Sequence, residues 1–361
     1  MNALRFILVG LGARSRVWRQ VIADNPRCTI VGLVDVDADR RAAALAQCPG
    51  AVAGDDLAEV AARASADAVI LITPPGNRHT QIAAACDAGL AILAEKPLAD
   101  SLAAARDHVA AAASAGIALS VGLNFRYLAV TRALCELFAE DRLGPPEFGH
   151  FTYERWRDGH LPHLNKYPLT MDQPMLWEQS IHHFDLMRHV YRADPVRISA
   201  RTWNPSWSMY RHDANVAALI TFERGIEVTY QGTWAGNWAQ PRFEWRTDCR
   251  HGVAIQSDMF GALGHARRDD PELIPVDLPA HAAWIDDAAA LLADFVAGLA
   301  DGAPLPCPGE DHLTSLRMVE ACIRAAATGQ TLDLTTPAVA QEPAGTFANR
   351  STTPKAERIA K

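Results

Sequence analysis

A short segment near the middle of the chain, residues 176–189, reads LWEQSIHHFDLMRH and sets acidic and imidazole side chains among large apolar ones. At about 100° per residue in a helix, four of its polar side chains fall within an arc of roughly 60°: Glu178, His182, Asp185 and His189. Large apolar side chains occupy much of the rest of the circumference, which reverses the proportion found on a helix at a protein surface; they are Trp177, Ile181, Phe184, Met187 and Val190. We therefore expect this polar stripe to face a cavity.

Two kinds of chemistry would suit such a stripe. Histidine titrates near neutral pH and can accept a hydroxyl proton, while a neighbouring carboxylate holds its ring. We predict that His182 is such a base, with Glu178 or Asp185 as the group that orients it. The alternative is a metal site, but no H-E-x-x-H motif occurs, and ligands strung along one helix cannot surround an ion. We expect no metal.

A turn near the start of the chain, GLGARS at residues 10–15, follows an apolar run. Two glycines at this spacing permit a tight turn and let backbone N–H groups approach a pyrophosphate, which the next helix also stabilises. Serine stands where a third glycine is usual, and its small side chain should be tolerated there. The cofactor-binding residues predicted in this turn are Gly10, Gly12, Ala13, Arg14 and Ser15.

An acidic residue, Asp35, ends the second apolar run. A carboxylate there accepts hydrogen bonds from the ribose hydroxyls of NAD and repels the 2′-phosphate of NADP. Arg40 and Arg41 follow and would offset this repulsion in part, so NADP is the less favoured cofactor. Further along, prolines after a strand would form a rigid rim at the same crevice; the cofactor-binding residues predicted there are Thr73, Pro74, Pro75 and His79.

The first third of the chain alternates short apolar runs with alanine-rich amphipathic segments. Near-continuous apolar runs are typical of strands covered on both faces, and alternation with helices predicts a parallel, doubly wound sheet. The expected strands lie at 5–10, 29–35, 67–73, 91–96 and 117–124, and the expected helices at 14–24, 38–47, 81–88 and 102–115.

After residue 126 the pattern changes to segments with partial period-two alternation, which predict a large mixed or antiparallel sheet. We expect the 176–189 helix and another at 282–299 to pack against it, and a last helix at 311–328 to lean on the first domain. The resulting α/β organisation has a Rossmann domain (1–123), a second α/β domain with an open sheet (124–335) and a mobile tail (336–361).

The bulk composition limits the partners. A net charge of −8 without basic runs gives no electrostatic attraction to nucleic acid or anionic lipid. The longest weakly polar stretch, 109–125, is too short to span a bilayer. The seven cysteines form no C-x-x-C pair, which predicts free thiols in a reducing compartment. We expect a cytoplasmic protein that acts on a small molecule.

Residues 94–98 read AEKPL after the expected fifth strand. Together with the glycine turn and the histidine helix, this motif makes the chain resemble the Gfo/Idh/MocA family of nicotinamide-dependent sugar and inositol dehydrogenases over about residues 4–335. The resemblance implies a Rossmann domain followed by an α/β domain whose open sheet forms a homodimer or homotetramer interface. It also places Glu95 and Lys96 at the cofactor and the substrate.

The resemblance assigns the family lysine to Lys96, its helix histidine to His182 and its later aspartate to Asp185. Two positions depart from the family: Glu178 replaces the usual aspartate, and Ser180 a frequent glycine. Glutamate keeps the charge but reaches one methylene further, so the usual substrate contact cannot be assumed. His183 is either a further ligand contact or a supporting residue.

Residues between the two motifs are candidates for substrate contacts. Asn124, Arg126 and Tyr127 leave the last Rossmann strand, and an aromatic, polar loop follows that includes Trp156. Flat rings that cover C–H faces and charged groups that bind hydroxyls suit a sugar, polyol or sugar acid. The substrate-binding residues expected are Lys96, Asn124, Arg126, Trp156, Glu178, His182 and Asp185; other candidates in the loop are Arg157, Asp158, His160, His163, Lys166 and Tyr167.

These residues predict an NAD-dependent dehydrogenase of a carbohydrate-like secondary alcohol. His182 would remove the hydroxyl proton, Lys96 would stabilise the developing alkoxide, and Glu178 would complete the catalytic set. Two alternatives remain open: a redox-neutral NAD-dependent glycosidase or lyase, which forms no net NADH, and a non-catalytic sensor that keeps the nucleotide fold.

Overall fold

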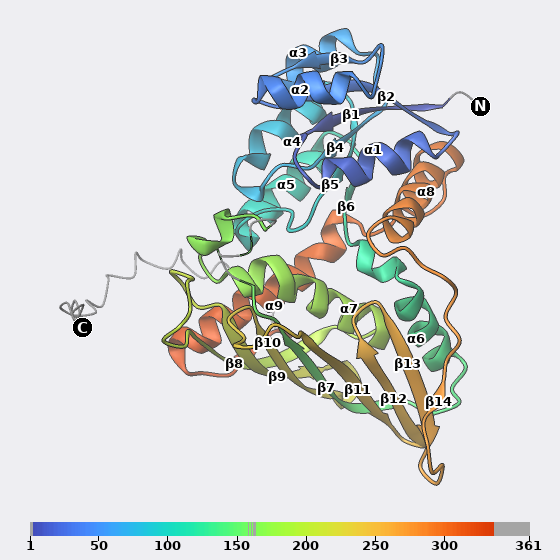
Figure 1. The fold of residues 1–361 in the computed structure, drawn as a ribbon, viewed down its shortest axis with the longest axis vertical. Coiled ribbons are helices and arrows are strands. Elements are labelled where there is room, and N and C mark those ends of the chain that lie inside the picture. Colours follow the sequence, from blue (N-terminus) through green and yellow to red (C-terminus); the bar gives the residue numbers. More distant parts are fainter. Residues whose placement is uncertain (1–2, 158, 160, 162–163, 336–361) are drawn as a thin grey trace, which may run out of the picture.

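The protein, seen here in a computed structural model, is described over residues 3–157, 159, 161 and 164–335, which form two sheets with covering helices (Figure 1). The expected tail at 336–361 and the loop candidates Asp158, His160 and His163 lie outside the described residues. No helix within the described ranges is long and apolar enough to cross a bilayer.

The first sheet confirms the expected doubly wound Rossmann arrangement. All its strands are parallel, in the order β3-β2-β1-β4-β5-β6. Strand β4 is buried along its whole length, which explains its continuous apolar sequence. Ligands of such sheets bind where the order reverses, here between β1 and β4, beyond the carboxyl ends. The strands are β1 (Leu4–Val9), β2 (Cys28–Val34), β3 (Val52–Gly54), β4 (Ala68–Leu71), β5 (Ala91–Ala94) and β6 (Leu119–Val121).

Helices connect these strands: α1 (Ser15–Ala23), α2 (Ala38–Leu45), α3 (Leu57–Arg63), α4 (Arg78–Asp87) and α5 (Leu102–Ser114). The side chains of Asp37, Asp56 and Ser101 cap the first turns of α2, α3 and α5. Of the described side chains, none caps α1, whose start faces the crevice. The short elements β3 and α3 were not among the expected ones, because neither is long enough to show a clear period.

The second sheet confirms the expected large mixed sheet, in the order β14-β13-β12-β11-β7-β10-β9-β8-β15. Strands β7 and β10 pair in parallel, and the other neighbours are antiparallel. Its strands are β7 (Pro146–Glu154), β8 (Pro195–Trp203), β9 (Asn215–Phe222), β10 (Glu227–Thr233), β11 (Arg242–Cys249), β12 (Gly252–Asp258), β13 (Gly261–Arg267), β14 (Ile274–Pro275) and β15 (Leu332–Asp333).

Helices lie on one side of this sheet: α6 (Ala129–Ala139), α7 (Ile181–Tyr191) and α9 (Gly309–Thr328) (Figure 1). Side chains that point away from these helices are exposed, among them Phe148 at 55% and Leu219 at 49%. The sheet is therefore open on one face.

The helix expected at 282–299 is found as α8 (Asp286–Asp301), but its expected packing is wrong. It lies against α1 and the short turn η2 (Asn124–Tyr127), not against the second sheet. The reason is that α7 and α9 already occupy the covered face of that sheet, while Leu291, Leu292 and Phe295 of α8 find a buried site beside the first domain. Helix α9 contacts both β8 and α5.

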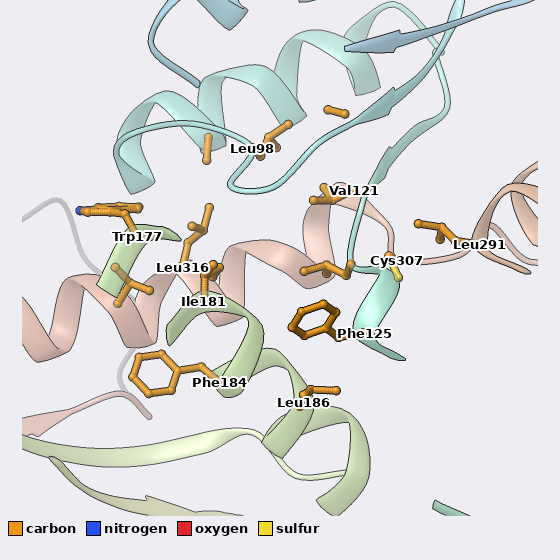
Figure 2. Packing of buried hydrophobic residues seen from close by; sticks show 14 of the residues in the cluster. Leu98, Val121, Phe125, Trp177, Ile181, Phe184, Leu186, Leu291, Cys307 and Leu316 are labelled. Carbon is orange, nitrogen blue, oxygen red and sulfur yellow. The ribbon is translucent and has the colours of Figure 1, made fainter. Parts of the chain in front are cut away.

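Buried apolar side chains from both halves of the chain form a common core (Figure 2). Leu98 and Val121 from the first half belong to the same cluster as Phe125, Ile181 and Leu316. Each such side chain contributes about 1.5–3 kcal/mol when removed from water. This core fixes α7 relative to the segment after β5, and thereby the relative positions of His182 and Lys96.

Candidate active site

A cavity of about 700 Å³ lies at the carboxyl ends of the first sheet and reaches α7. It brings together most of the predicted site residues from both halves of the chain. Those that line it are Gly10, Gly12, Ala13, Arg14, Asp35, Thr73, Pro74, Pro75, Glu95, Lys96, Asn124, Glu178 and His182.

The glycine turn at one end of the cavity has the space and polarity that a dinucleotide pyrophosphate requires. Gly10 has a φ of +92°, and a Cβ there would lie 3.0 Å from the Thr73 backbone nitrogen, so only glycine fits. A Cβ on Gly12 would meet nothing within 4 Å, which leaves open space beside the turn. No described side chain caps α1, so the positive end of its dipole faces the open space beside the turn, although the N–H groups of Ser15 and Arg16 donate to the Gly12 and Ala13 oxygens at 3.1 and 3.2 Å. These residues fit a bound NAD.

Asp35 is almost fully buried beside this turn and already accepts two backbone hydrogen bonds. Its carboxylate receives the N–H of Leu11 at 2.6 Å and that of Asp37 at 2.9 Å. A carboxylate can accept further bonds, so ribose hydroxyls can still bind it. The half-exposed guanidinium of Arg40 lies 3.9 Å from the same carboxylate.

The Glu95 side chain anchors the segment that carries Lys96. Its carboxylate accepts hydrogen bonds from Arg14 Nε at 2.5 Å and from Trp18 Nε1 at 2.9 Å. Burial raises the pKa of Glu95, but the Arg14 charge and the two hydrogen bonds outweigh it, so the pKa lies below its ordinary value. The ionised Glu95 therefore ties the Lys96 segment to the glycine turn.

The main chain of the same segment is bound by Arg78 and His312. The Arg78 side chain, 1% exposed, donates to the carbonyl oxygens of Glu95 and Pro97 and to that of Thr73 at 2.6 Å. Burial lowers the pKa of Arg78 to about 10, so it remains charged at neutral pH. From α9, His312 Nε2 accepts the N–H of Leu98 at 3.4 Å.

Lys96 reaches across the cavity to the start of the histidine helix. Its Nζ donates to the Glu178 backbone oxygen at 2.8 Å and lies 3.3 Å from Glu178 Oε2. Tyr167 donates a hydrogen bond to the same carboxylate; burial and this negative partner raise the pKa of Tyr167 above its ordinary value. The second carboxylate oxygen, Oε1, is buried and has no partner among the described residues.

His182 lies at the same end of the cavity, 4% exposed, with its ring stacked on Phe125 at a centroid distance of 4.1 Å. Burial and then the charge of Lys96 lower the pKa of His182 well below 6.5. The expectation that a carboxylate orients the ring is wrong, because Nδ1 is buried without a hydrogen-bond partner among the described residues. Stacking on Phe125 holds the imidazole instead.

Asp185 and Arg126 do not line the cavity, which corrects the expectation that they contact substrate. Arg126 donates to Asp185 at 2.7 and 2.5 Å and also to Asp311 at 2.6 Å. Arg188 binds Asp311 at 2.7 Å. These side chains form an ion-pair network at the junction of η2, α7 and α9.

The polar stripe expected on one helix is divided between a π-helical turn and α7. Residues Leu176–Ser180 form a π-helical turn, and α7 begins only at Ile181. A π turn shifts the angular register of the side chains before it, and such turns occur often at functional sites. Glu178 in the π turn and His182 in the first turn of α7 line the cavity, whereas Asp185, further along α7, is held by Arg126 and Ser315.

Three other predicted residues also lie away from the cavity. Ser15 is fully buried and donates to the Gly12 oxygen at 2.7 Å, so it shapes the turn from inside. His79 is exposed on α4, and Trp156 lines a separate hollow with Trp207 and Trp234. Among the residues that the structure describes, no group of three or more His, Cys, Asp or Glu side chains is arranged to hold a metal ion.

Several residues that were not assigned to the site line it as well, notably Arg78, Asn165 and Trp284. Tyr167 was only one of many loop candidates. Asn165 lies among the loop candidates, next to Lys166, but an asparagine there has no distinguishing pattern; nothing in the sequence marks Trp284, which reaches the cavity from a loop far from both motifs. Arg78 directly precedes the predicted His79, and its position after the proline rim was the available signal.

Comparison with known proteins agrees with this arrangement. Residues 4–123 match the oxidoreductase family with an NAD-binding Rossmann fold, and residues 131–250 match the GFO/IDH/MocA C-terminal domain. The chain belongs to the Gfo/Idh/MocA oxidoreductase family. The family expected from the Glu95-Lys96-Pro97 motif and the His182 helix is thus confirmed.

Two curated relatives match most of the chain. A 1,5-anhydro-D-fructose reductase of Ensifer adhaerens is 26% identical over 92% of this chain and 99% of its own length. An inositol 2-dehydrogenase of Cereibacter sphaeroides is 28% identical over 89% of this chain and 93% of its own length. The fold is shared with a crystal structure of an oxidoreductase from Agrobacterium radiobacter, which was solved in complex with NAD+, L-tartaric acid and magnesium. The TM-score is 0.83 at 21% identity, and the match covers 92% of this chain and 98% of that one.

Proposed function

We propose that the protein is an NAD-dependent dehydrogenase that oxidises a secondary alcohol of a sugar, polyol or sugar acid. The observation that carries this proposal is that Lys96 and His182, from opposite halves of the chain, line the same cavity as the glycine turn. Similarity to enzymes named inositol 2-dehydrogenase and 1,5-anhydro-D-fructose reductase supports the substrate class.

When bound, NAD supplies the hydride acceptor. His182 is the base in this proposal: its depressed pKa keeps the imidazole neutral at neutral pH and ready to take the hydroxyl proton. Lys96 donates a hydrogen bond to the same oxygen and stabilises the negative charge that develops there. The positive Lys96 also lowers the pKa of the alcohol, which offsets the weak basicity of a buried imidazole.

Glu178 would do two things. Its carboxylate and backbone oxygen hold the Lys96 ammonium in place. Its buried and unpartnered Oε1 is an acceptor for a substrate hydroxyl, and an unsatisfied buried carboxylate oxygen is costly without one. In this way glutamate takes the place of the aspartate that is usual in the family.

We further propose NAD as the preferred cofactor, because the Asp35 carboxylate lies where a 2′-phosphate would be repelled. The open face of the second sheet, with Phe148 and Leu219 exposed, suits a homodimer or homotetramer interface. The cytoplasmic location stays a prediction.

A screen of the purified protein with NAD and a panel of cyclitols, aldoses and polyols tests the proposal, with NADH absorbance as the readout. H182A should abolish turnover while NAD affinity stays nearly unchanged, since the histidine lies at the α7 end of the cavity. Unchanged turnover in H182A would remove His182 as the base. Substrate cleavage without net NADH would favour the redox-neutral alternative.

A further inference from the structure

One aromatic side chain at the cavity has an unusual position in the fold. Trp284 lies in the loop that precedes α8, lines the cavity and remains 44% exposed. Large aromatic side chains are usually more deeply buried, because their contact area makes exposure to water unfavourable. A tryptophan left half-open at the wall of a cavity is a ready surface for a ligand.

The backbone at Trp284 is strained. Its φ is +76°, in the left-handed region that costs an L-residue about 1–2 kcal/mol. Such a conformation persists only where the surroundings hold it, and it is found often at ligand sites. Trp284 adopts this conformation directly before α8, which begins two residues later at Asp286.

The neighbours of Trp284 fix its ring between the two ends of the site. Phe125 and Phe260 approach it edge-on, at centroid distances of 5.2 and 5.7 Å. The Arg14 guanidinium lies 5.8 Å from the indole centroid. Because Phe125 also stacks on His182 at 4.1 Å, the indole belongs to the same aromatic row as the predicted base.

We propose that Trp284 is a substrate-recognition residue whose indole stacks on the C–H face of a cyclic carbohydrate, a pyranose or cyclitol. This inference rests on the proposed dehydrogenase function and narrows its substrate class. A ring sugar presents hydroxyls at its edge and C–H groups on its face. Lys96 and Glu178 supply the polar partners for the edge, and Trp284 supplies the apolar wall for the face. An open-chain polyol lacks a rigid face and would gain less from the indole.

The test compares W284F and W284A with a matched pair, W238F and W238A. Trp238 is 72% exposed and is not among the residues that line the cavity, so its loss controls for removing one indole. The probes are myo-inositol and D-glucose as cyclic alcohols and D-glucitol as an open-chain one, each with saturating NAD. NADH formation gives kcat and KM, and tryptophan fluorescence reports binding.

W284A should raise KM for a cyclic probe about tenfold, which corresponds to about 1.4 kcal/mol, with a smaller change in kcat. W284F, which keeps a ring, should show an intermediate effect, and the fluorescence change seen on binding a cyclic probe in the wild type should disappear in W284F. The Trp238 variants should behave like the wild type. The affinity for NAD should not change in any variant.

Other outcomes would overturn the assignment. An unchanged KM in W284A, in an enzyme that does form NADH, would show that the indole makes no substrate contact. A weaker affinity for NAD with unchanged KM would assign the indole to the cofactor. An equal effect on D-glucitol would remove the preference for a ring. NADH formation by the wild type tests the dehydrogenase proposal separately.

Discussion

Replacing Asp185 by asparagine distinguishes a substrate contact from a structural ion pair. Asp185 is 2% exposed and accepts two hydrogen bonds from Arg126, at 2.7 and 2.5 Å, and one from Ser315 at 3.2 Å. Burial raises the pKa of Asp185, but Arg126 outweighs it and holds the pKa below its ordinary value. We expect D185N to weaken the junction between η2, α7 and α9 and to leave substrate recognition intact.

The expected loss of stability in D185N depends on the partner that Arg126 retains. Breaking a buried ion pair by removing one partner costs about 3–5 kcal/mol. In D185N, Arg126 keeps its contact with Asp311 at 2.6 Å, and the Asp311 side chain is 34% exposed. We therefore expect the loss of stability to lie at the lower end of this range, about 3 kcal/mol. An unfolding entropy of ~2.1 cal/mol/K per residue over 361 residues converts this into a Tm lower by about 4 °C.

Thermal unfolding and steady-state kinetics of D185N and D311N measure both sides of this prediction. D311N is the control, because the partly exposed Asp311 should contribute only about 1 kcal/mol after solvent screening. Substrate KM should stay within about twofold of the wild type in both variants. A large rise of KM in D185N at unchanged Tm would show that Asp185 contacts substrate and that our interpretation of the network is wrong.

Four further features lead to predictions. Burial lowers the pKa of both His183 and His312 to about 3, while the pKa of an unfolded histidine is 6.5. The free energy of unfolding should therefore be highest above pH 6.5 and should fall by about 1.4 kcal/mol per pH unit for each histidine as the pH drops from there towards 3. Urea unfolding at several pH values measures this fall, and a flat profile would contradict it. Burial and Lys96 place the pKa of His182 well below 6.5, so kcat/KM should show no acid limb centred at 6.5 or above when measured against pH. D35S should weaken NAD binding about tenfold and raise the affinity for NADP relative to NAD, both measured by cofactor titration. If D35S keeps the preference for NAD, Asp35 does not select between the two cofactors. E178D keeps the backbone hydrogen bond to Lys96 but moves the carboxylate away from the cavity, so the substrate KM should rise by a larger factor than kcat falls. If kcat and KM of E178D equal those of the wild type, Glu178 Oε1 binds no substrate hydroxyl.

Much of the fold follows from local sequence rules. The apolar runs, the turn at Gly10 and Gly12 and the carboxylate at Asp35 predict a parallel sheet with a nucleotide site, because covered strands and tight turns restrict residue choice position by position. Alternation of apolar and polar residues predicted the second sheet, but it did not predict how many strands the sheet has. The sequences of the strands from β12 to β15 show no clear alternation.

The helix at 176–189 separates what the sequence determines from what the tertiary structure decides. Spacing alone identifies Glu178 and His182 as neighbours on a helix, since each side chain's direction around its own axis is a local property. The partners of these side chains depend on how distant segments pack. Arg126 binds Asp185 at the junction of η2, α7 and α9, and Phe125 stacks on His182. A loop more than 100 residues further along the chain brings Trp284 to the same cavity. No local pattern encodes these contacts, because they form only when the two halves of the chain share one core.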